Sequence, residues 1–405
     1  MIEIIIIADD LTGAADTGVQ FLEMSGRSLK MVGLDHKISS APCGGLALHT
    51  QTRNESAFTA KLAMDRAADV ARRMEPKVIY KKIDSCLRGH VGLELGALVQ
   101  NLNFKGALVA PAYPTFGRVT KEGLHYVGDT LVSESEVARD PIRPVTDSRL
   151  EAIIGRGHDC TVCRLGLDII EKGVEAVTRT IENMLQSDGP VMIAADAVTD
   201  HDLDILAEAG LKFKDRLILT GSAGLAGGLA RAAADKPQAV EKKGPSGPII
   251  YFGGSTSKSL QQQIGQLAEA GYVEHITIDI NQLLESGGEL PLPRRPEDGR
   301  DLAVVLPPPH DDAPIAGENF SRRLITTFGY YAANLVRSLK PSAIFMCGGD
   351  TAQAILSCLN LNELWLRSEP IPGMVYMEAG KMSILTKAGS FGAADILVKL
   401  HQSLR

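Results

Sequence analysis

The stretch IIIIADD at residues 4–10 constrains the fold of this chain more than any other. Four isoleucines and an alanine form a short, apolar and largely β-branched run, which is typical of a strand covered on both faces inside a parallel sheet. Asp9 and Asp10 follow at once, and residues 14–24 have the pattern of a helix with an apolar face. We therefore expect a buried strand that ends in two carboxylates just before a helix.

The place of these two carboxylates predicts a ligand site. In open α/β sheets, ligands bind beyond the carboxyl ends of the strands. A pair of acids there is costly unless a cation, a polar ligand or a metal ion needs it. The alternative is that Asp9 or Asp10 only caps the helix, although a cap needs one acid rather than two.

Strand-like and helix-like segments alternate along the first half of the chain. Apolar runs of strand length lie at 29–34, 44–49, 77–83, 106–112, 191–195 and 216–220. Amphipathic stretches such as 57–74 and 168–185 lie between them. This alternation predicts βαβ units and a largely parallel sheet.

The chain is too long for one ordinary core, because it has 405 residues. We expect a first domain at 1–234, a polar linker rich in Pro and Gly at 235–248, and a second domain at 249–405. In the second domain, a strand precedes a helix from Lys258, LAVVL is one short strand, and 316–339 is helical with an interruption at Gly329. The predicted fold class is α/β, with two domains that are each a largely parallel sheet flanked by helices, and the active site in the cleft between them.

Composition excludes several classes of protein. Hydrophobic residues make up 44% and charged residues 22%, as in globular chains, and the formal net charge of −7 argues against a nucleic-acid partner. No run of about 18 apolar residues indicates a membrane segment, and no signal-peptide pattern precedes the first strand, so we expect a cytoplasmic protein. Cys160 and Cys163 form a CxxC, but no second pair or nearby histidine completes a zinc set, and the flanking sequence resembles a buried strand, which favours packing over zinc or redox chemistry.

The stretch KKIDSCLRGH at residues 81–90 is the densest in reactive side chains. If its strand ends near Lys82, the side chains of Lys82 and Asp84 leave that end in one direction, two residues apart. Arg88 would lie at the start of the next helix, where backbone N–H groups also favour anions. Cations beside Asp84 and Ser85 suit a ligand that is both anionic and hydroxylated. The alternative is a surface charge cluster. Arg53, which follows the strand at 44–49, could add a guanidinium at the same edge.

Three Gly-rich turns mark the second domain. They are GGSTSK at 253–258, CGGDTA at 347–352 and KAGSFGAAD at 387–395. Glycine lets a backbone approach a ligand closely, and successive N–H groups can form a nest for phosphates. Neither the Walker spacing nor GxGxxG after a strand is present. One domain for a hydroxylated acid and one for a nucleotide together predict phosphoryl transfer.

Five motifs resemble those of the four-carbon acid sugar kinase family. They are ADDLTGA at 8–14, KKIDSCLRG at 81–89, AYPTFGR at 112–118, GGDTA at 348–352 and KAGSFG at 387–392. The resemblance covers essentially the whole chain, with the motifs in the family's order. It implies an N-terminal sugar-acid domain and a C-terminal nucleotide domain. It also implies transfer of phosphate from ATP to the terminal hydroxyl of threonate, erythronate or 3-oxo-tetronate.

The resemblance also implies the site residues. The substrate motifs contain Asp9, Asp10, Arg53, Lys82, Asp84, Ser85 and Arg88. The nucleotide motifs contain Ser255, Gly348, Gly349, Asp350, Thr351, Gly389, Ser390, Phe391 and Gly392. Mg²⁺ would accompany ATP, with Asp350 as a candidate carboxylate. The expected partners are a small sugar acid and ATP, with no nucleic acid and no membrane, while a homodimer stays open.

We expect Asp9 or Asp10 to orient or deprotonate the accepting hydroxyl, with Asp10 slightly favoured and Asp84 as a further catalytic candidate. Lys82 and Arg88 should offset the two acids and, with Arg53, hold the substrate. Two other functions stay open. An aldolase or dehydratase could use a Schiff base in the region of Lys81 and Lys82, and a non-catalytic module could sense a sugar acid and a nucleotide.

Overall fold

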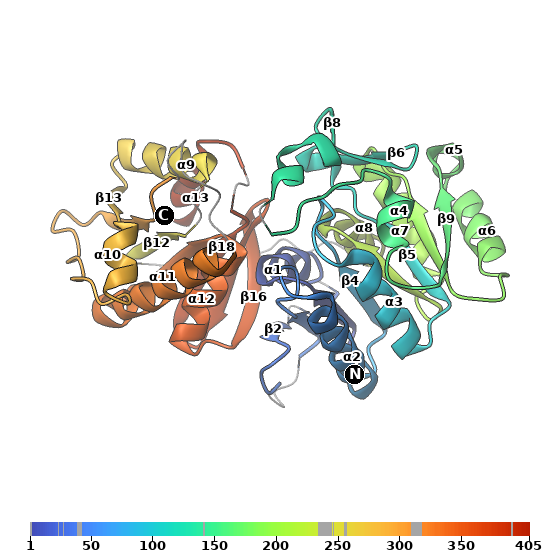
Figure 1. Ribbon diagram of the computed structural model, residues 1–405, viewed down its shortest axis with the longest axis horizontal. Coiled ribbons are helices and arrows are strands. Elements are labelled where there is room, and N and C mark those ends of the chain that lie inside the picture. The colour runs from blue at the N-terminus through green and yellow to red at the C-terminus, as the bar shows by residue number, and fades with distance from the viewer. Residues whose placement is uncertain are drawn as a thin grey trace. The chain divides into compact units, whose positions relative to one another are not determined.

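The computed structural model of the chain describes residues 2–22, 24–26, 28–38, 43–140, 142–233, 245, 247–254, 257–308, 318–389 and 392–405. The chain divides into two compact units, residues 1–238 and 239–405. In Figure 1 the N-terminal unit runs from blue to green and the C-terminal unit from yellow to red. Most of the predicted linker at 235–248 lies outside the described residues.

The N-terminal unit is built on a parallel sheet with the strand order β2-β3-β1-β4-β11-β5-β10-β9. Its strands are β1 (Ile4–Ala8), β2 (Leu29–Gly33), β3 (Gly45–His49), β4 (Val78–Lys82), β5 (Gly106–Ala110), β9 (Thr161–Leu165), β10 (Val191–Ala195) and β11 (Leu217–Gly221). Every residue of β1 is fully buried. The isoleucine run therefore forms the two-faced strand that its composition predicts.

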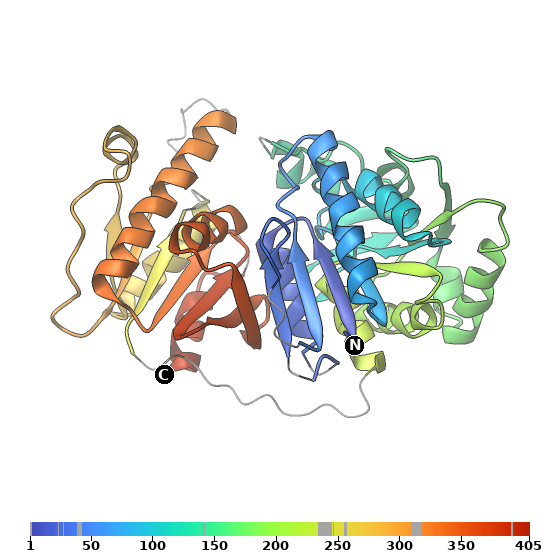
Figure 2. The ribbon, with the colours of Figure 1, turned by 90° about the horizontal axis from the view of Figure 1, so that it is seen from below.

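Helices cover both faces of this sheet (Figure 2). They are α1 (Leu11–Gln20), α2 (Ala57–Met74), α3 (Val91–Leu102), α4 (Leu150–Ile154), α5 (Leu167–Ile170), α6 (Val174–Met184), α7 (Asp200–Leu211) and α8 (Ala223–Ala233). On one face, Ile5 and Ile7 pack into a core with residues of α2 and α3, among them Met64 and Leu95. Because side chains alternate along a strand, Ile4 and Ile6 point to the other face.

A second, antiparallel sheet lies in the long segment after β5, and the sequence pattern did not predict it. Its strands are β6 (Arg118–Lys121), β7 (Leu124–Val127) and β8 (Thr130–Leu131), accompanied by the short 3₁₀ helices η1 (Pro114–Phe116), η2 (Val132–Glu134) and η3 (Glu136–Arg139). These strands are short and only partly buried. Their hydrophobic signal is correspondingly weak.

The C-terminal unit has the strand order β13-β14-β12-β15-β18-β17-β16. Its strands are β12 (Ile249–Gly253), β13 (Val273–Thr277), β14 (Asp301–Val305), β15 (Ala343–Cys347), β16 (Glu363–Ile371), β17 (Met374–Ala379) and β18 (Met382–Lys387), and its helices are α9 (Lys258–Glu269), α10 (Ile280–Glu285), α11 (Glu318–Leu339), α12 (Gly349–Leu359) and α13 (Ile396–Leu404). The first five strands of that order are parallel, and β17 and β16 continue the sheet antiparallel. The unit is thus largely parallel, as predicted.

Three expectations about single elements need correction. The stretch 168–185 is two helices, because Gly173 between them has a φ of 87° that a continuous α-helix does not allow. Gly329 does not interrupt α11; there the helix lies so close to α12 that a Cβ atom would stand 2.7 Å from Cβ of Ala354. Strand β9, which contains Cys163 and directly follows Cys160, is only partly buried, and both cysteines are free thiols. Over the described residues, none of the helices has the length and apolarity to cross a membrane, and the cytoplasmic location stays a prediction.

Candidate functional site

Three neighbouring strands of the N-terminal unit carry the predicted substrate residues. Strand β1 lies between β3 and β4, and the register pairs Ala8 with both His49 and Lys82. The three strands therefore end level with one another. The segments that follow them hold Asp9 and Asp10, Arg53, and Asp84 to Arg88, so these side chains meet at the carboxyl edge of the sheet.

Arg53 binds both acids that follow β1. Its Nε and Nη2 donate hydrogen bonds of 2.8 and 2.9 Å to the two oxygens of Asp9, and its Nη1 donates one of 2.8 Å to Oδ2 of Asp10. Burial by itself raises the pKa of Asp9, but the Arg53 guanidinium outweighs it and the pKa is lowered. Asp9 is thus ionised at neutral pH. The residue that pairs directly with both acids is Arg53; of the two cations expected to offset them, Lys82 adds a favourable charge near Asp9, whereas Arg88 pairs with Asp84.

Asp10 also caps a helix. It is the N-cap residue of α1, and its Oδ1 accepts a 2.7 Å hydrogen bond from the backbone N–H of Gly13. The hydroxyl of Thr12 donates a 2.8 Å hydrogen bond to Oδ2 of the same carboxylate. Asp10 therefore accepts three hydrogen bonds, whereas Asp9 accepts its side-chain hydrogen bonds from Arg53 alone within the described residues. The capping alternative holds for one of the two acids.

Lys82 lies beside this cap. Its side chain is buried, and its ammonium donates a 3.0 Å hydrogen bond to the carbonyl of Ile83. A Cβ atom on Gly13 would stand 3.1 Å from the Lys82 nitrogen and 2.4 Å from Oδ1 of Asp10. Gly13 is thus the residue that lets the ammonium, the carboxylate and the start of α1 come together.

Asp84 and Arg88 form the other half of the cluster. Nε and Nη2 of Arg88 donate hydrogen bonds of 2.8 and 3.2 Å to Asp84, and Nη1 reaches Oδ2 of Asp140 at 3.4 Å. Burial raises the pKa of Asp84, but Arg88 and Arg53 together hold it far below its usual range. The carbonyl of Ser85, which is half-buried, accepts a 2.7 Å hydrogen bond from Nε2 of His125.

Lys81 points away from this cluster. Its ammonium pairs with Oε2 of Glu94 at 2.7 Å, and both side chains are buried in the core. The other oxygen of Glu94 accepts a 2.8 Å hydrogen bond from Thr52, the residue before Arg53. Lys81 is therefore bound inside the domain rather than presented to a ligand.

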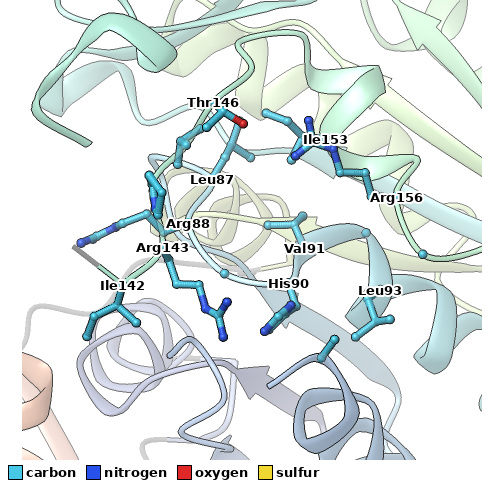
Figure 3. Close-up of a pocket in the computed structure, with 16 residues that line it drawn as sticks. Leu87, Arg88, His90, Val91, Leu93, Ile142, Arg143, Thr146, Ile153 and Arg156 are labelled. Atoms are coloured by element: carbon cyan, nitrogen blue, oxygen red, sulfur yellow. The ribbon is translucent and has the colours of Figure 1, made fainter. Parts of the chain in front are cut away.

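A pocket of about 380 Å³ adjoins the cluster at Arg88 and Gly89. Figure 3 shows the side chains of Arg88, Arg143 and Arg156 around it, together with the ring of His90 at the N-terminus of α3. Arg143 donates hydrogen bonds to the carbonyls of Arg53, at 3.1 Å, and Glu55. Among the described residues, no aspartate or glutamate lines the pocket.

The Gly-rich turns of the C-terminal unit also meet at one sheet edge. Strands β12, β15 and β18 are parallel neighbours, and the register pairs Gly253 with Cys347 and Cys347 with Lys387. The turns that follow therefore lie side by side. Gly348 has a φ of 98°, which residues other than glycine rarely adopt. Helix α12 begins at the next residue, and the backbone N–H groups of its first turn have no partner within the helix.

Close approaches and hydrogen bonds position the described residues of these turns. A Cβ atom on Gly254 would stand 2.3 Å from Oγ1 of Thr351, so only glycine allows this approach. The ammonium of Lys387 donates hydrogen bonds of 3.0 and 2.7 Å to the carbonyls of Ala388 and Gly389, and burial lowers its pKa. The carbonyl of Gly392 accepts a 2.9 Å hydrogen bond from Gln263 of α9.

The other residues predicted to bind the nucleotide or its Mg²⁺ are exposed or lie outside the described residues. Asp350 is exposed in the first turn of α12, directly after Gly349. Ser255, Ser390 and Phe391 lie outside the described residues. Within the part of the chain that the structure describes, no group of three His, Cys, Asp or Glu side chains could hold a metal ion. These residues would then supply at most two such ligands to Mg²⁺, which suits an ion held mainly by ATP phosphates.

Sequence reasoning missed several residues that complete the site. Glu94 and His125 lie far along the chain from the motifs they support, and Asp140 and Arg143 lie in a loop without helix or strand periodicity. Only the concentration of charge in RDPIRP, residues 139–144, gave a signal for that loop.

Both domains match known protein families, and the whole chain is similar to known kinases. Residues 4–229 match the family described as "Sugar-binding N-terminal domain", and residues 250–397 match "Nucleotide-binding C-terminal domain". D-threonate kinase of Salmonella typhimurium is 28% identical over 98% of this chain and 96% of its own length. 3-oxo-tetronate kinase of Cupriavidus necator is 27% identical over 96% of this chain and 94% of its own.

Solved structures agree on the fold. A Salmonella typhimurium LT2 protein superposes with a TM-score of 0.82 at 22% identity, covering 100% of both chains. A Bordetella bronchiseptica protein, crystallised as a domain-swapped dimer with bound citrate, has a TM-score of 0.51 at 27% identity over 99% of this chain and 98% of its own.

The molecule is thus a two-domain α/β protein with a sugar-binding and a nucleotide-binding domain. It belongs to the four-carbon acid sugar kinase family.

Proposed function

We propose that the chain is an ATP-dependent kinase that phosphorylates the terminal hydroxyl of a four-carbon sugar acid such as D-threonate, D-erythronate or 3-oxo-tetronate. The observation that carries this proposal is the cluster of Asp9, Asp10, Arg53, Asp84 and Arg88 at the carboxyl edge of the N-terminal sheet. It offers ionised carboxylates to hydroxyls, with arginines fixed beside them as counter-charges, in a domain whose family binds sugars. The similarity to a D-threonate kinase and a 3-oxo-tetronate kinase supports the substrate class.

Asp9 is the carboxylate that we assign to the accepting hydroxyl. The two oxygens of Asp10 already accept from Gly13, Thr12 and Arg53, so little acceptor capacity is left. Asp9 has one side-chain partner, and each of its oxygens keeps a lone pair. Its lowered pKa makes it a weak base that is ionised throughout the neutral range. We therefore expect it to act mainly by orienting the hydroxyl, since phosphoryl transfer needs positioning more than early proton removal.

Lys82 supplies a cation for the anionic oxygens near the acceptor. An ammonium has three donors, and within the described residues one of them is used, by the carbonyl of Ile83. The nitrogen stands beside Gly13 at the N-terminus of α1, where the helix dipole adds positive potential. Asp84, held by Arg88, and Ser85 would bind the remaining hydroxyls of the acid.

The C-terminal unit would bind ATP through its Gly-rich turns. The close approach of Gly254 to Thr351 and the start of α12 after Gly348 form a cradle of backbone N–H groups that fits phosphates. Mg²⁺ would be held by the phosphates, with Asp350 as its protein carboxylate, and would neutralise charge on them. We assign the domains to 1–234 and 249–405, and the matched ranges 4–229 and 250–397 support these limits.

The positions of the two lysines give little support to an aldolase or dehydratase that forms a Schiff base. Lys81 is buried in its ion pair with Glu94, so a Schiff base would have to form on Lys82.

As the assembly we propose a homodimer, by analogy with the domain-swapped dimer of the Bordetella bronchiseptica protein. Light scattering of the purified chain tests this: a mass of twice 43.3 kDa supports it, and 43.3 kDa contradicts it.

The direct test is a coupled ADP-release assay over the stereoisomers of threonate, erythronate and 3-oxo-tetronate, with Mg²⁺ and ATP. ADP release that depends on one of these acids supports the kinase. Conversion of an acid without ATP would favour the aldolase or dehydratase. Binding of acid and nucleotide without ADP release would favour the sensing module.

A further inference from the structure

We propose that the pocket behind Arg88 binds the carboxylate group of the sugar acid, and that Arg143 is the residue that selects an acid over an uncharged sugar. This inference rests on the proposed function for the identity of the ligand. Its physical basis is a charge balance, a cavity and a short path to Asp9.

The ionic cluster at the sheet edge has no cation that lacks a carboxylate to balance it. Its three carboxylates, Asp9, Asp10 and Asp84, face three cations, Arg53, Lys82 and Arg88. Nε, Nη1 and Nη2 of Arg53 each donate to Asp9 or Asp10. A fourth carboxylate placed among them would lack a partner, and an unpaired charge in a buried site is costly. The acid end of the substrate therefore needs a cation outside the cluster.

Arg143 is such a cation. Its Nε and Nη2 donate to backbone carbonyls, its Nη1 has no acceptor among the described residues, and no carboxylate there forms an ion pair with it. Its position is fixed, because Oδ1 of Asp140 accepts a 2.9 Å hydrogen bond from the Arg143 backbone N–H while Oδ2 reaches Arg88. Asp140 thus holds Arg88 and Arg143 on the same pocket wall.

The rest of the pocket also favours an anion. Arg156, whose Nη2 also lies 3.5 Å from Oδ2 of Asp147, stands on the side opposite Arg88 and Arg143 (Figure 3). Helix α3, with 12 residues, begins at the pocket, and its N-cap residue His90 gives it no side-chain cap. Its first N–H groups and its dipole therefore add positive potential. Buried apolar side chains such as Val91 and Val145 complete the wall and reduce the screening by water.

The pocket lies next to the reacting end of the cluster. Gly89 lines it, and a Cβ atom on Gly89 would stand only 3.3 Å from Oδ2 of Asp9. One backbone segment thus separates the pocket from the carboxylate assigned to the accepting hydroxyl. In the proposed binding mode, the carboxylate of the four-carbon acid lies beside Arg143 and its terminal hydroxyl lies at Asp9. The volume of about 380 Å³ lies within the range of small-molecule sites.

The test compares an acid with its own uncharged analogue. The two ligands are the sugar acid that is turned over best and the amide of the same acid, and the variants are Arg143→Gln and Arg139→Gln. Arg139 is an exposed arginine at the end of η3, just before the loop of Arg143, and it is not among the residues that line the pocket. Calorimetry without ATP measures affinity, and ADP release measures kcat and KM.

We expect Arg143→Gln to weaken binding of the acid by about 10-fold to 100-fold, as for loss of a hydrogen bond between charged groups. The affinity of this variant for the amide, and its kcat, should each change by less than about threefold. The preference for the acid over the amide should therefore be lost. Arg139→Gln should behave as the wild type. If acid and amide lose affinity equally, Arg143 only supports the loop, and the proposal is overturned. Unchanged affinity for the acid overturns it as well.

Failure of the proposed function would be recognisable separately. If the wild type neither binds nor phosphorylates any four-carbon acid, that function falls. Titration with glycolate and with inorganic phosphate then tests the pocket as an anion site. Binding of either anion that Arg143→Gln abolishes supports the site, whereas no binding, or binding that the variant retains, contradicts it.

Discussion

Lys81 and Glu94 form an ion pair of 2.7 Å in which neither side chain is more than 2% exposed. The pair joins β4 to α3, and Glu94 also accepts a hydrogen bond from Thr52, whose backbone N–H donates to the carbonyl of Asp9. The neighbour of Thr52 is Arg53. A pair buried inside the domain thus supports the segment that carries the central guanidinium of the site.

Removing one partner of this pair should destabilise the N-terminal unit strongly. Glu94→Gln leaves the Lys81 ammonium buried without a counter-charge, and we expect a loss of about 3–5 kcal/mol in the free energy of unfolding. The double variant Lys81→Met with Glu94→Leu should recover most of it, because no unpaired charge remains. Urea denaturation followed by circular dichroism measures both. A single variant as stable as the wild type would refute the role given to the pair.

The two acids after β1 should respond differently to the same substitution. Asp9→Asn should lower kcat by roughly 10²-fold or more while the fold survives. Asp10→Asn should cost less, because Asn caps helices nearly as well as Asp. Asp35→Asn, at an exposed ion pair, is the control. ADP release and circular dichroism give turnover and folding, and a larger loss in Asp10→Asn would reverse the assignment.

The nucleotide turns offer a steric test. Gly254→Ala places a Cβ atom 2.3 Å from Oγ1 of Thr351, so the turn must move and its N–H groups lose their alignment. We expect ATP affinity, measured by calorimetry, to fall about tenfold or more. Affinity for the sugar acid should stay the same. Gly265→Ala, at an open position inside α9, should leave both affinities unchanged. Equal loss of both ligands in Gly254→Ala would contradict the division of labour.

His125 should make stability depend on pH. Since Ser85 can only accept through its carbonyl, Nε2 of His125 carries a proton and Nδ1 accepts from Thr120, as in neutral imidazole. Burial lowers the pKa of His125 from 6.5 to about 4. As pH falls below 6.5, the unfolded chain therefore binds a proton before the folded one does. Stability present above pH 6.5 should be lost toward pH 4, by up to about 3 kcal/mol.

The corresponding experiment follows the urea midpoint from pH 7.5 to pH 4. His125→Gln keeps a donor and an acceptor but cannot titrate there, so its midpoint should fall less steeply than that of the wild type. His49, whose pKa burial lowers to about 4, keeps part of the slope. The exposed His201 gives the control variant His201→Gln. Identical slopes in all three proteins would rule out His125 as the titrating group.

Much of the fold and part of the site could be predicted because both depend on local pattern. The run at 4–8 specifies a doubly buried strand, and parallel strands with level ends bring their following segments together. Pairing partners were less predictable. Sequence does not reveal that β1 lies between β3 and β4, which is what brings Arg53 to Asp9.

Roles that depend on backbone conformation could not be predicted either. Which of Asp9 and Asp10 caps α1 depends on where the first backbone N–H groups of the helix point. The sequence alone allows either acid to be the cap. Lys81 and Lys82 must point to opposite faces of β4, but the sequence does not say which of the two faces α3. The loop with Asp140 and Arg143 has no periodicity, so its pocket could not be predicted.

The position of the transferred phosphate is the most direct test of the central claim. The purified chain is incubated with Mg²⁺, ATP and the four-carbon acid that releases most ADP, and the product is examined by ³¹P–¹H correlation NMR. We predict one phosphomonoester whose phosphorus couples to the two protons of the terminal carbon. Absence of a phosphoester, or phosphate on a secondary hydroxyl or on the carboxylate, would contradict the claim that Asp9 presents the terminal hydroxyl for transfer.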